Sequence, residues 1–133
     1  MSLAIRRCLI VAALVVVSVL PAAAALAASF NTTLSYTVDL TGPNRDFFQA
    51  SSMTIRGTYA RSAPAVATTH RVELWRNRFG PDDFVGSSNV PREGFASRTW
   101  TNTGPGTYRF RYVKAADGVR ITNNDLVIRD QNG

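Results

Sequence analysis

GPGTYRFRYVKAADGVRITNNDLVIR, residues 104–129, is the stretch that decides the fold. After a turn at residues 104–106, aromatic and basic residues alternate: Tyr108, Arg109, Phe110, Arg111, Tyr112. Alternation with a period of two is typical of a β-strand with one buried face. We therefore expect the aromatic side chains to face a core and the arginines to face outward. Further turn signals at Asp117-Gly118 and at residues 123–125 each precede a short apolar segment, which predicts more strands.

Similar short segments recur along the rest of the chain and predict about seven strands. The segments are residues 29–40, 52–61, 70–78, 95–101, 107–114, 119–122 and 126–129. Turns rich in Gly, Pro, Asn and Asp separate them, and no window shows a helical stripe. This pattern favours an all-β fold, a single antiparallel β-sandwich in which two sheets stack to bury their apolar faces.

Two places depart from regular alternation. Gly57 lies inside the segment 52–61, where a glycine marks a β-bulge or the close approach of another chain. Residues 79–94 contain Gly80-Pro81, Pro91 and several apolar side chains without a clear period. We interpret them as a long loop, and a loop of this length in a compact domain is usually functional, disordered or a misread element.

The first 27 residues have the features of a secretory signal peptide. Arg6 and Arg7 precede the apolar run of residues 9–20, and residues 25–27 read Ala-Leu-Ala, which fits a cleavage site. We predict cleavage before Ala28, one domain at residues 28–133, secretion, and no membrane span after cleavage. An uncleaved N-terminal anchor is the alternative.

Composition restricts the chemistry of the predicted mature chain. Cys8 is the only cysteine and lies in the signal segment, so the domain is expected to fold without disulfides. Loss of Arg6 and Arg7 lowers the formal net charge from +6 to +4. This modest charge favours anionic partners but does not indicate nucleic acid. Lys114 is the only lysine among 15 basic residues, a bias that suggests a GC-rich, actinobacterial source.

The sequence offers little material for catalysis. His70 is the only histidine, and its alternation with Val72 and Leu74 indicates a strand position, without a nucleophile motif nearby. The acids Asp82, Asp83 and Glu93 lie in or beside the predicted loop, but their spacing has no specificity for glycoside cleavage. We therefore expect a protein that is not an enzyme and has no cofactor.

Calcium remains open. Oxygen ligands gather in the two predicted turns near the C-terminus: Asp117, Asn123, Asn124, Asp125. Asx residues also occur in turns for backbone reasons alone, so the same residues are explained without a metal.

Partner-binding candidates fall into two groups: outward-facing side chains on the strands, and the start of the mature chain. Trp75 lies on the opposite face of its strand from Val72 and Leu74 and is therefore expected to face outward. The alternatives are that a bulge exchanges the two faces, or that Phe79 or Phe84 covers the indole. Arg109 and Arg111 are expected to form a basic outer face with Arg56, unless these are scattered solubilising charges. The second group is the start of the mature chain, predicted as a free segment that could add to another protein's sheet: Ser29, Phe30, Asn31, Thr32, Thr33.

The signal segment, the cysteine-free β domain and the free segment at residues 28–33 resemble the small adaptor subunit of the actinobacterial umbrella toxin particles. The resemblance covers size, class and layout and rests on no specific motif. It implies an adaptor that joins other secreted proteins in a hetero-oligomeric antibacterial toxin complex, with residues 29–33 in the contact. The alternatives are a carbohydrate or cell-wall binding module, using Trp75 or Tyr59 as a stacking platform, and a small protease inhibitor that presents the loop 79–94.

Overall fold

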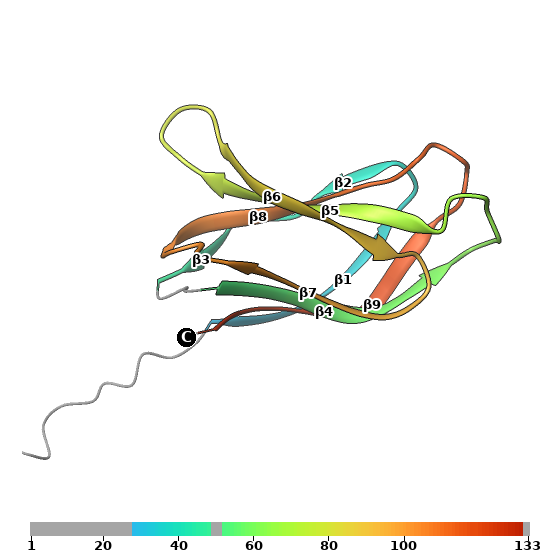
Figure 1. The fold of residues 1–133 in the computed structure, drawn as a ribbon, viewed down its shortest axis with the longest axis horizontal. Coiled ribbons are helices and arrows are strands. Elements are labelled where there is room, and N and C mark those ends of the chain that lie inside the picture. Colours follow the sequence, from blue (N-terminus) through green and yellow to red (C-terminus); the bar gives the residue numbers. More distant parts are fainter. Residues whose placement is uncertain (1–27, 49–51, 132–133) are drawn as a thin grey trace, which may run out of the picture.

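The structure, a computed structural model, describes residues 28–48 and 52–131 (Figure 1). Within these residues the regular elements are all β-strands, nine in number, and every pairing between them is antiparallel. The predicted all-β class is therefore confirmed. The predicted signal segment, residues 1–27, lies outside the described residues.

The strands form two sheets. Sheet 1 has the spatial order β1 (Ser29–Tyr36), β9 (Ile121–Gln131), β4 (Ser52–Arg61) and β7 (Gly94–Thr101). Sheet 2 has the order β2 (Asp39–Thr41), β8 (Gly106–Val113), β5 (Thr69–Asn77) and β6 (Asp83–Pro91). The short strand β3 (Arg45–Phe47) also pairs with β8, at residues 106–108, whereas β2 pairs with residues 111–113. The two sheets form two layers (Figure 1), and β1 and β6 are edge strands of sheet 1 and sheet 2, respectively.

One hydrophobic core lies between the sheets. The side chains of Tyr108, Phe110 and Tyr112 are buried in it, as the alternation in β8 predicts. Trp100 of sheet 1 packs against Phe110 of sheet 2 with 5.4 Å between ring centroids, so the inner faces of the two sheets are in contact. Aromatic area of this kind gives a domain without disulfides its main stabilising term.

Three boundaries differ from the sequence prediction. The segment 29–40 is not one strand, because the chain leaves sheet 1 after Tyr36 and enters sheet 2 at Asp39, which leaves Val38 half exposed. The two strands predicted at 119–122 and 126–129 are one strand, β9. Most of the predicted loop 79–94 is also a strand, β6, which pairs with β5 along its whole length.

The Asx residues expected to form a turn at 123–125 instead form a bulge in β9. The register of β9 shifts by one residue against both neighbours, between Thr32 and Leu34 of β1 and between Arg56 and Tyr59 of β4. The Asp125 carboxylate accepts the backbone N–H of Thr58 at 2.7 Å, and Asn123 Oδ1 accepts the N–H of Asp125 at 3.0 Å. These side chains therefore satisfy donors at the interruption of the ladder.

Gly57 lies opposite this bulge and confirms the prediction of a close approach. A Cβ at this position would lie 2.6 Å from Nδ2 of Asn123, a distance at which two heavy atoms overlap. The buried Asn123 side chain thus occupies the space that the missing side chain leaves. A residue with a Cβ would displace it, so the bulge and the glycine depend on each other.

The two long sides of the molecule differ. On one side, Arg98 of β7 donates to the backbone oxygen of Asn89 of β6 at 3.2 and 3.3 Å, and Gly86 of β6 packs on the indole of Trp100. We call this the closed side, because the edge strands of the two sheets are joined. On the opposite side, β1 of sheet 1 faces β2 and β3 of sheet 2 across a cavity, and we call this the open side.

Candidate binding site

The predicted free segment is an edge strand. Ser29, Phe30, Asn31 and Thr32 pair with residues 126–129 of β9, so the expectation of an unpaired segment is wrong. The cause is the inward face of β1, where Phe30 packs edge-on against Phe47 at 5.4 Å, anchoring the segment to the core. In the part of the chain that the structure describes, β1 pairs only with β9, which leaves its other edge without a strand.

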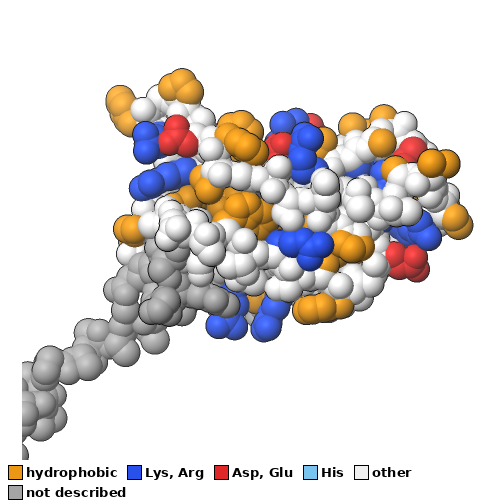
Figure 2. Space-filling view, viewed as in Figure 1, with side chains coloured by type: hydrophobic (Ala, Val, Ile, Leu, Met, Phe, Trp, Pro, Cys, Tyr) orange, Lys and Arg blue, Asp and Glu red, His pale blue; other side chains and the backbone are white. Residues whose placement is uncertain are grey.

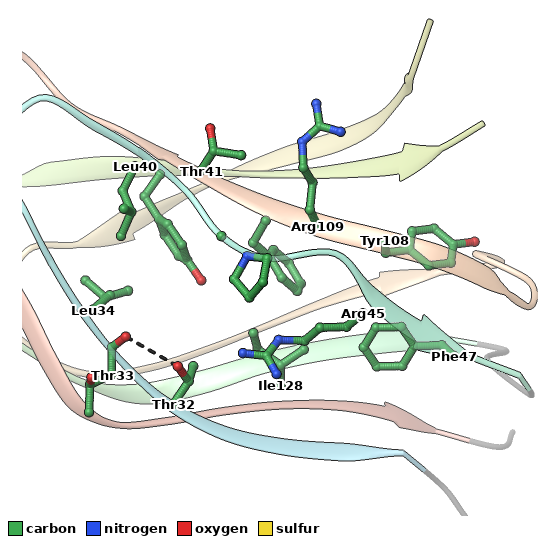
Figure 3. Close-up of a pocket in the computed structure, with 14 residues that line it drawn as sticks. Thr32, Thr33, Leu34, Leu40, Thr41, Arg45, Phe47, Tyr108, Arg109 and Ile128 are labelled. Carbon is green, nitrogen blue, oxygen red and sulfur yellow. Dashed lines mark hydrogen bonds between the residues drawn. The ribbon is translucent and has the colours of Figure 1, made fainter. Parts of the chain in front are cut away.

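A cavity of about 180 Å³ opens beside β1, between the two sheets. Thr32, Thr33 and Leu34 of β1 line one wall, and the segment from Leu40 to Arg45 lines the other (Figure 3). The remainder of the lining is Arg109 and five core side chains: Phe47, Tyr108, Phe110, Tyr112, Ile128. The cavity is therefore a largely apolar recess that reaches from the open side toward the core.

Arg45 is the charged side chain directed into this recess. Figure 3 shows its guanidinium extending from β3 toward Thr32, whereas the Arg109 side chain points away from the cavity. The guanidinium carbon of Arg45 lies 4.7 Å from the ring centroid of Phe30, a cation–π contact that links sheet 2 to sheet 1. Its Nε is buried and has no hydrogen-bond partner among the described residues.

Trp75, Arg109 and Arg111 come together on the outer face of sheet 2. Trp75 and Arg109 are register partners, and the guanidinium carbon of Arg109 lies 5.6 Å from the Trp75 ring centroid. Phe84 packs against the other part of the indole at 5.2 Å, and Trp75 Nε1 donates to Glu73 at 3.2 Å. Trp75 does face outward, but Phe84 and Arg109 leave it only partly exposed.

The basic face is not formed. Arg109 forms an ion pair with Asp82, and Arg111 lies 2.9 Å from Asp39 and 3.6 Å from Glu73. Arg56 is on β4 in sheet 1, so it cannot share a face with arginines on the outer side of sheet 2. The outer face of sheet 2 therefore carries alternating charges, not a basic patch.

Among the large hydrophobic residues that the structure describes, the most exposed one lies on the β5–β6 hairpin. Phe79 in its connection is fully solvent-exposed, and Phe84 and Val85 of β6 are also exposed. An ion pair between Arg78 and Asp83 at 2.6 Å joins the two arms of the hairpin, and Gly80 has a left-handed φ of 108°. The hairpin tip therefore presents an aromatic side chain to solvent on a braced support (Figure 2 shows apolar side chains at the protruding tip).

His70 is buried near the start of β5, at the end of that strand away from the β5–β6 hairpin. Its Nδ1 lies 2.6 Å from the Tyr36 hydroxyl, and Tyr59 packs edge-on against its ring at 4.7 Å. Burial, with the positive charges of Arg92 and Lys114, lowers the pKa of His70 to about 4. Burial also raises the pKa of Tyr59 to about 12. These groups stay neutral at physiological pH and have no access to a substrate, which fits a structural role.

Beside His70, a cluster of Arg92, Lys114 and Asp117 connects neighbouring loops through ion pairs and hydrogen bonds. The guanidinium of Arg92 is buried, donates to the Thr69 oxygen at 2.9 Å and pairs with Asp117 at 2.6 Å. Lys114 Nζ donates to Asp117 at 2.8 Å and to the backbone oxygens of Thr37 and Ala115. Lys114 and Arg92 hold the pKa of Asp117 well below its usual range.

The proposed calcium ligands are not collected into one site. Asp117 is occupied by Arg92 and Lys114, whereas Asn123 is buried in β9 and Asp125 binds the Thr58 N–H. Across residues 28–48 and 52–131, no three His, Cys, Asp or Glu side chains gather as a metal site. Over the same ranges there is no helix long and apolar enough to span a membrane.

Sequence reasoning missed Arg45, although a signal was present. Arg45 and Phe47 are two residues apart in a three-residue strand, and Phe47 is among the most buried side chains. Residues with this spacing share one face of a strand. Once Phe47 is assigned to the core, the same period directs Arg45 inward.

Comparison with known proteins gives no assignment: the chain matches no protein-family model and no curated protein.

Proposed function

We propose that this chain is a non-enzymatic, secreted binding protein that bridges components of an extracellular antibacterial toxin complex as an adaptor. The observation that carries the binding role is the unprotected edge of β1. We also infer that the two facing sheets form a β-sandwich, and that residues 1–27 are a signal peptide cleaved before Ala28. N-terminal sequencing of the secreted protein tests the cleavage directly, because any other first residue contradicts it.

The edge strands of natural sheets usually carry charges, proline or other features that prevent pairing with foreign strands. The edge strand β6 contains Asp83 and Pro91, and β7 contains Arg98. In contrast, β1 reads SFNTTLSY and has neither a charge nor a proline. Its outer edge can therefore accept an extended segment of a partner by main-chain hydrogen bonding, and the adjacent recess can take a side chain from that segment.

The partner test uses tagged protein recovered from culture supernatant. We expect stoichiometric co-elution of other secreted proteins, and loss of at least one of them with Thr33→Lys, which places a charge on the β1 edge. Thr58→Lys is the matched control, because Thr58 is also exposed but lies on the central strand β4. Deleting residues 28–33 is unsuitable, since it would remove pairing with β9. Co-elution that is unchanged by Thr33→Lys would contradict docking through β1.

A protease inhibitor is the second candidate, and the exposed Phe79 at the braced hairpin tip is the observation that favours it. Inhibition of chymotrypsin-like proteases that is lost in Phe79→Ser would support it. The carbohydrate module is less favoured. Tyr59 is 2% exposed and cannot be a stacking platform, and the Trp75 ring is covered in part by Arg109 and Phe84.

A further inference from the structure

We propose that the recess on the open side is a binding site for a small carboxylate whose apolar part is about the size of one benzene ring. This inference goes beyond the partner binding described above and does not depend on it, because it rests on the recess itself. Three observations carry it: the volume, the apolar lining, and the cation directed into it.

Volume and lining define the apolar part of the ligand. The recess measures about 180 Å³, close to the roughly 150 Å³ of an engineered apolar cavity that stays dry and binds benzene. Its floor is formed by the core side chains of Leu34, Phe110, Tyr112 and Ile128. A floor of this kind favours a single ring or a short branched chain over a polar molecule.

Arg45 defines the charged part of the ligand. Its guanidinium reaches into the recess (Figure 3), its buried Nε has no hydrogen-bond partner among the described residues, and none of the ion pairs found among them includes Arg45. Arg98 on the closed side shows the contrast, because its guanidinium donates to the backbone oxygens of Asn89 and Ser97. Arg98 therefore already has acceptors within the protein, whereas a carboxylate bound in the recess would supply a charged acceptor to Arg45.

The charge count favours a monoanion over a phosphate. Arg109 also borders the recess, but its side chain points away from it and pairs with Asp82 (Figure 3). One available cation in a recess that is otherwise largely apolar matches one negative charge. A dianion would remain half unneutralised beside an apolar floor, which is unfavourable.

The test is a titration of the purified protein with phenylacetate and with the neutral phenylethanol, followed by amide NMR. We expect saturable shifts confined to residues 32–34 and 40–45, and binding of phenylethanol roughly tenfold weaker because it cannot pair with Arg45. In Arg45→Gln the affinity for phenylacetate should fall about tenfold, to that of the alcohol. Arg56→Gln removes the same charge from an exposed site on sheet 1 and should change nothing.

A second variant covers the case in which Arg45→Gln does not fold. Thr32→Ile keeps a β-branched residue and the cation but reduces the space in the recess, so we expect both ligands to lose binding while the melting curve stays cooperative. The proposal is overturned if phenylacetate produces no saturable shifts, if the shifts map elsewhere, if both ligands bind equally, or if Thr32→Ile binds as the unmodified protein does. These results concern the recess and not main-chain pairing at the β1 edge, so the two proposals fail separately.

Discussion

Mild acid is expected to weaken the fold through His70. The folded state lowers the pKa of His70 to about 4, whereas the ordinary value in an unfolded chain is 6.5. The unfolded state therefore binds the proton more readily, and stability is retained above pH 6.5 and lost as the pH falls from 6.5 toward 4. For these two pKa values, linkage gives a loss of about 2 kcal/mol at about pH 5 and about 3 kcal/mol at about pH 4.

The physical cause lies in the surroundings of the ring. His70 is 2% exposed, one ring nitrogen faces the Tyr36 hydroxyl, and the nearby charges of Arg92 and Lys114 are both positive. An imidazolium here would lose its hydration and be repelled by two cations, with no carboxylate in contact to offset either effect among the described residues. A domain with a free energy of unfolding of about 5 to 15 kcal/mol would register the change clearly.

Urea unfolding followed by tryptophan fluorescence at several pH values measures this effect. The free energy of unfolding should fall by about 2 kcal/mol between about pH 7.5 and 5, a range in which most carboxylates remain ionised in both states. His70→Gln should be less stable at neutral pH but should lose most of the pH dependence in that range. Equal stability of the unmodified protein at the two pH values, or an unchanged slope in His70→Gln, would refute the reasoning.

Two further substitutions, with a third as a control, test other parts of the fold. Gly57→Ala should destabilise the protein by about 1 to 3 kcal/mol, because its Cβ would overlap the buried Asn123 amide; a denaturation midpoint equal to that of the unmodified protein would contradict the packing of the bulge. Arg92→Ala should cost about 2 to 4 kcal/mol, because it removes a buried guanidinium and leaves Asp117 with one partner fewer. Arg61→Ala, which breaks a surface ion pair between half-buried Arg61 and exposed Glu93, should cost less than about 1 kcal/mol in the same urea unfolding experiment. Equal decreases in the free energy of unfolding for the two arginine variants would contradict the larger contribution expected from the buried Arg92.

The regular strands could be predicted because burial on one face imposes a period of two. Tyr108, Phe110 and Tyr112 follow it without exception and are buried. The strand β6 was missed because it is an edge strand with exposed residues on both faces, and Val90 is its only buried side chain. A strand that buries little leaves little periodicity to detect.

The candidate site was harder to predict than the sheets. Alternation continues from Tyr36 to Leu40, so the sequence does not show that the chain changes sheets between them and opens one side of the molecule. The Asx residues at 123–125 satisfy backbone donors in a bulge as readily as in a turn, so their identity does not distinguish the two. The recess and Arg45 depend on strands far apart in the sequence, which local patterns cannot bring together.

The pairing of β1 with β9 has a consequence for the order in which the fold can be completed. Ser29 lies opposite Arg129, so the first described strand depends on the last one, and β9 also separates β1 from β4 in the sheet. A chain that emerges N-terminus first, from a ribosome or through a translocation channel, cannot assemble sheet 1 until β9 has emerged. Until then β1 lacks the strand with which it pairs in the described fold, and its uncharged edge is open to other extended segments. The time that β1 stays unpaired is set by how long β9 takes to emerge, and a chain truncated before β9 would keep this edge unpaired permanently.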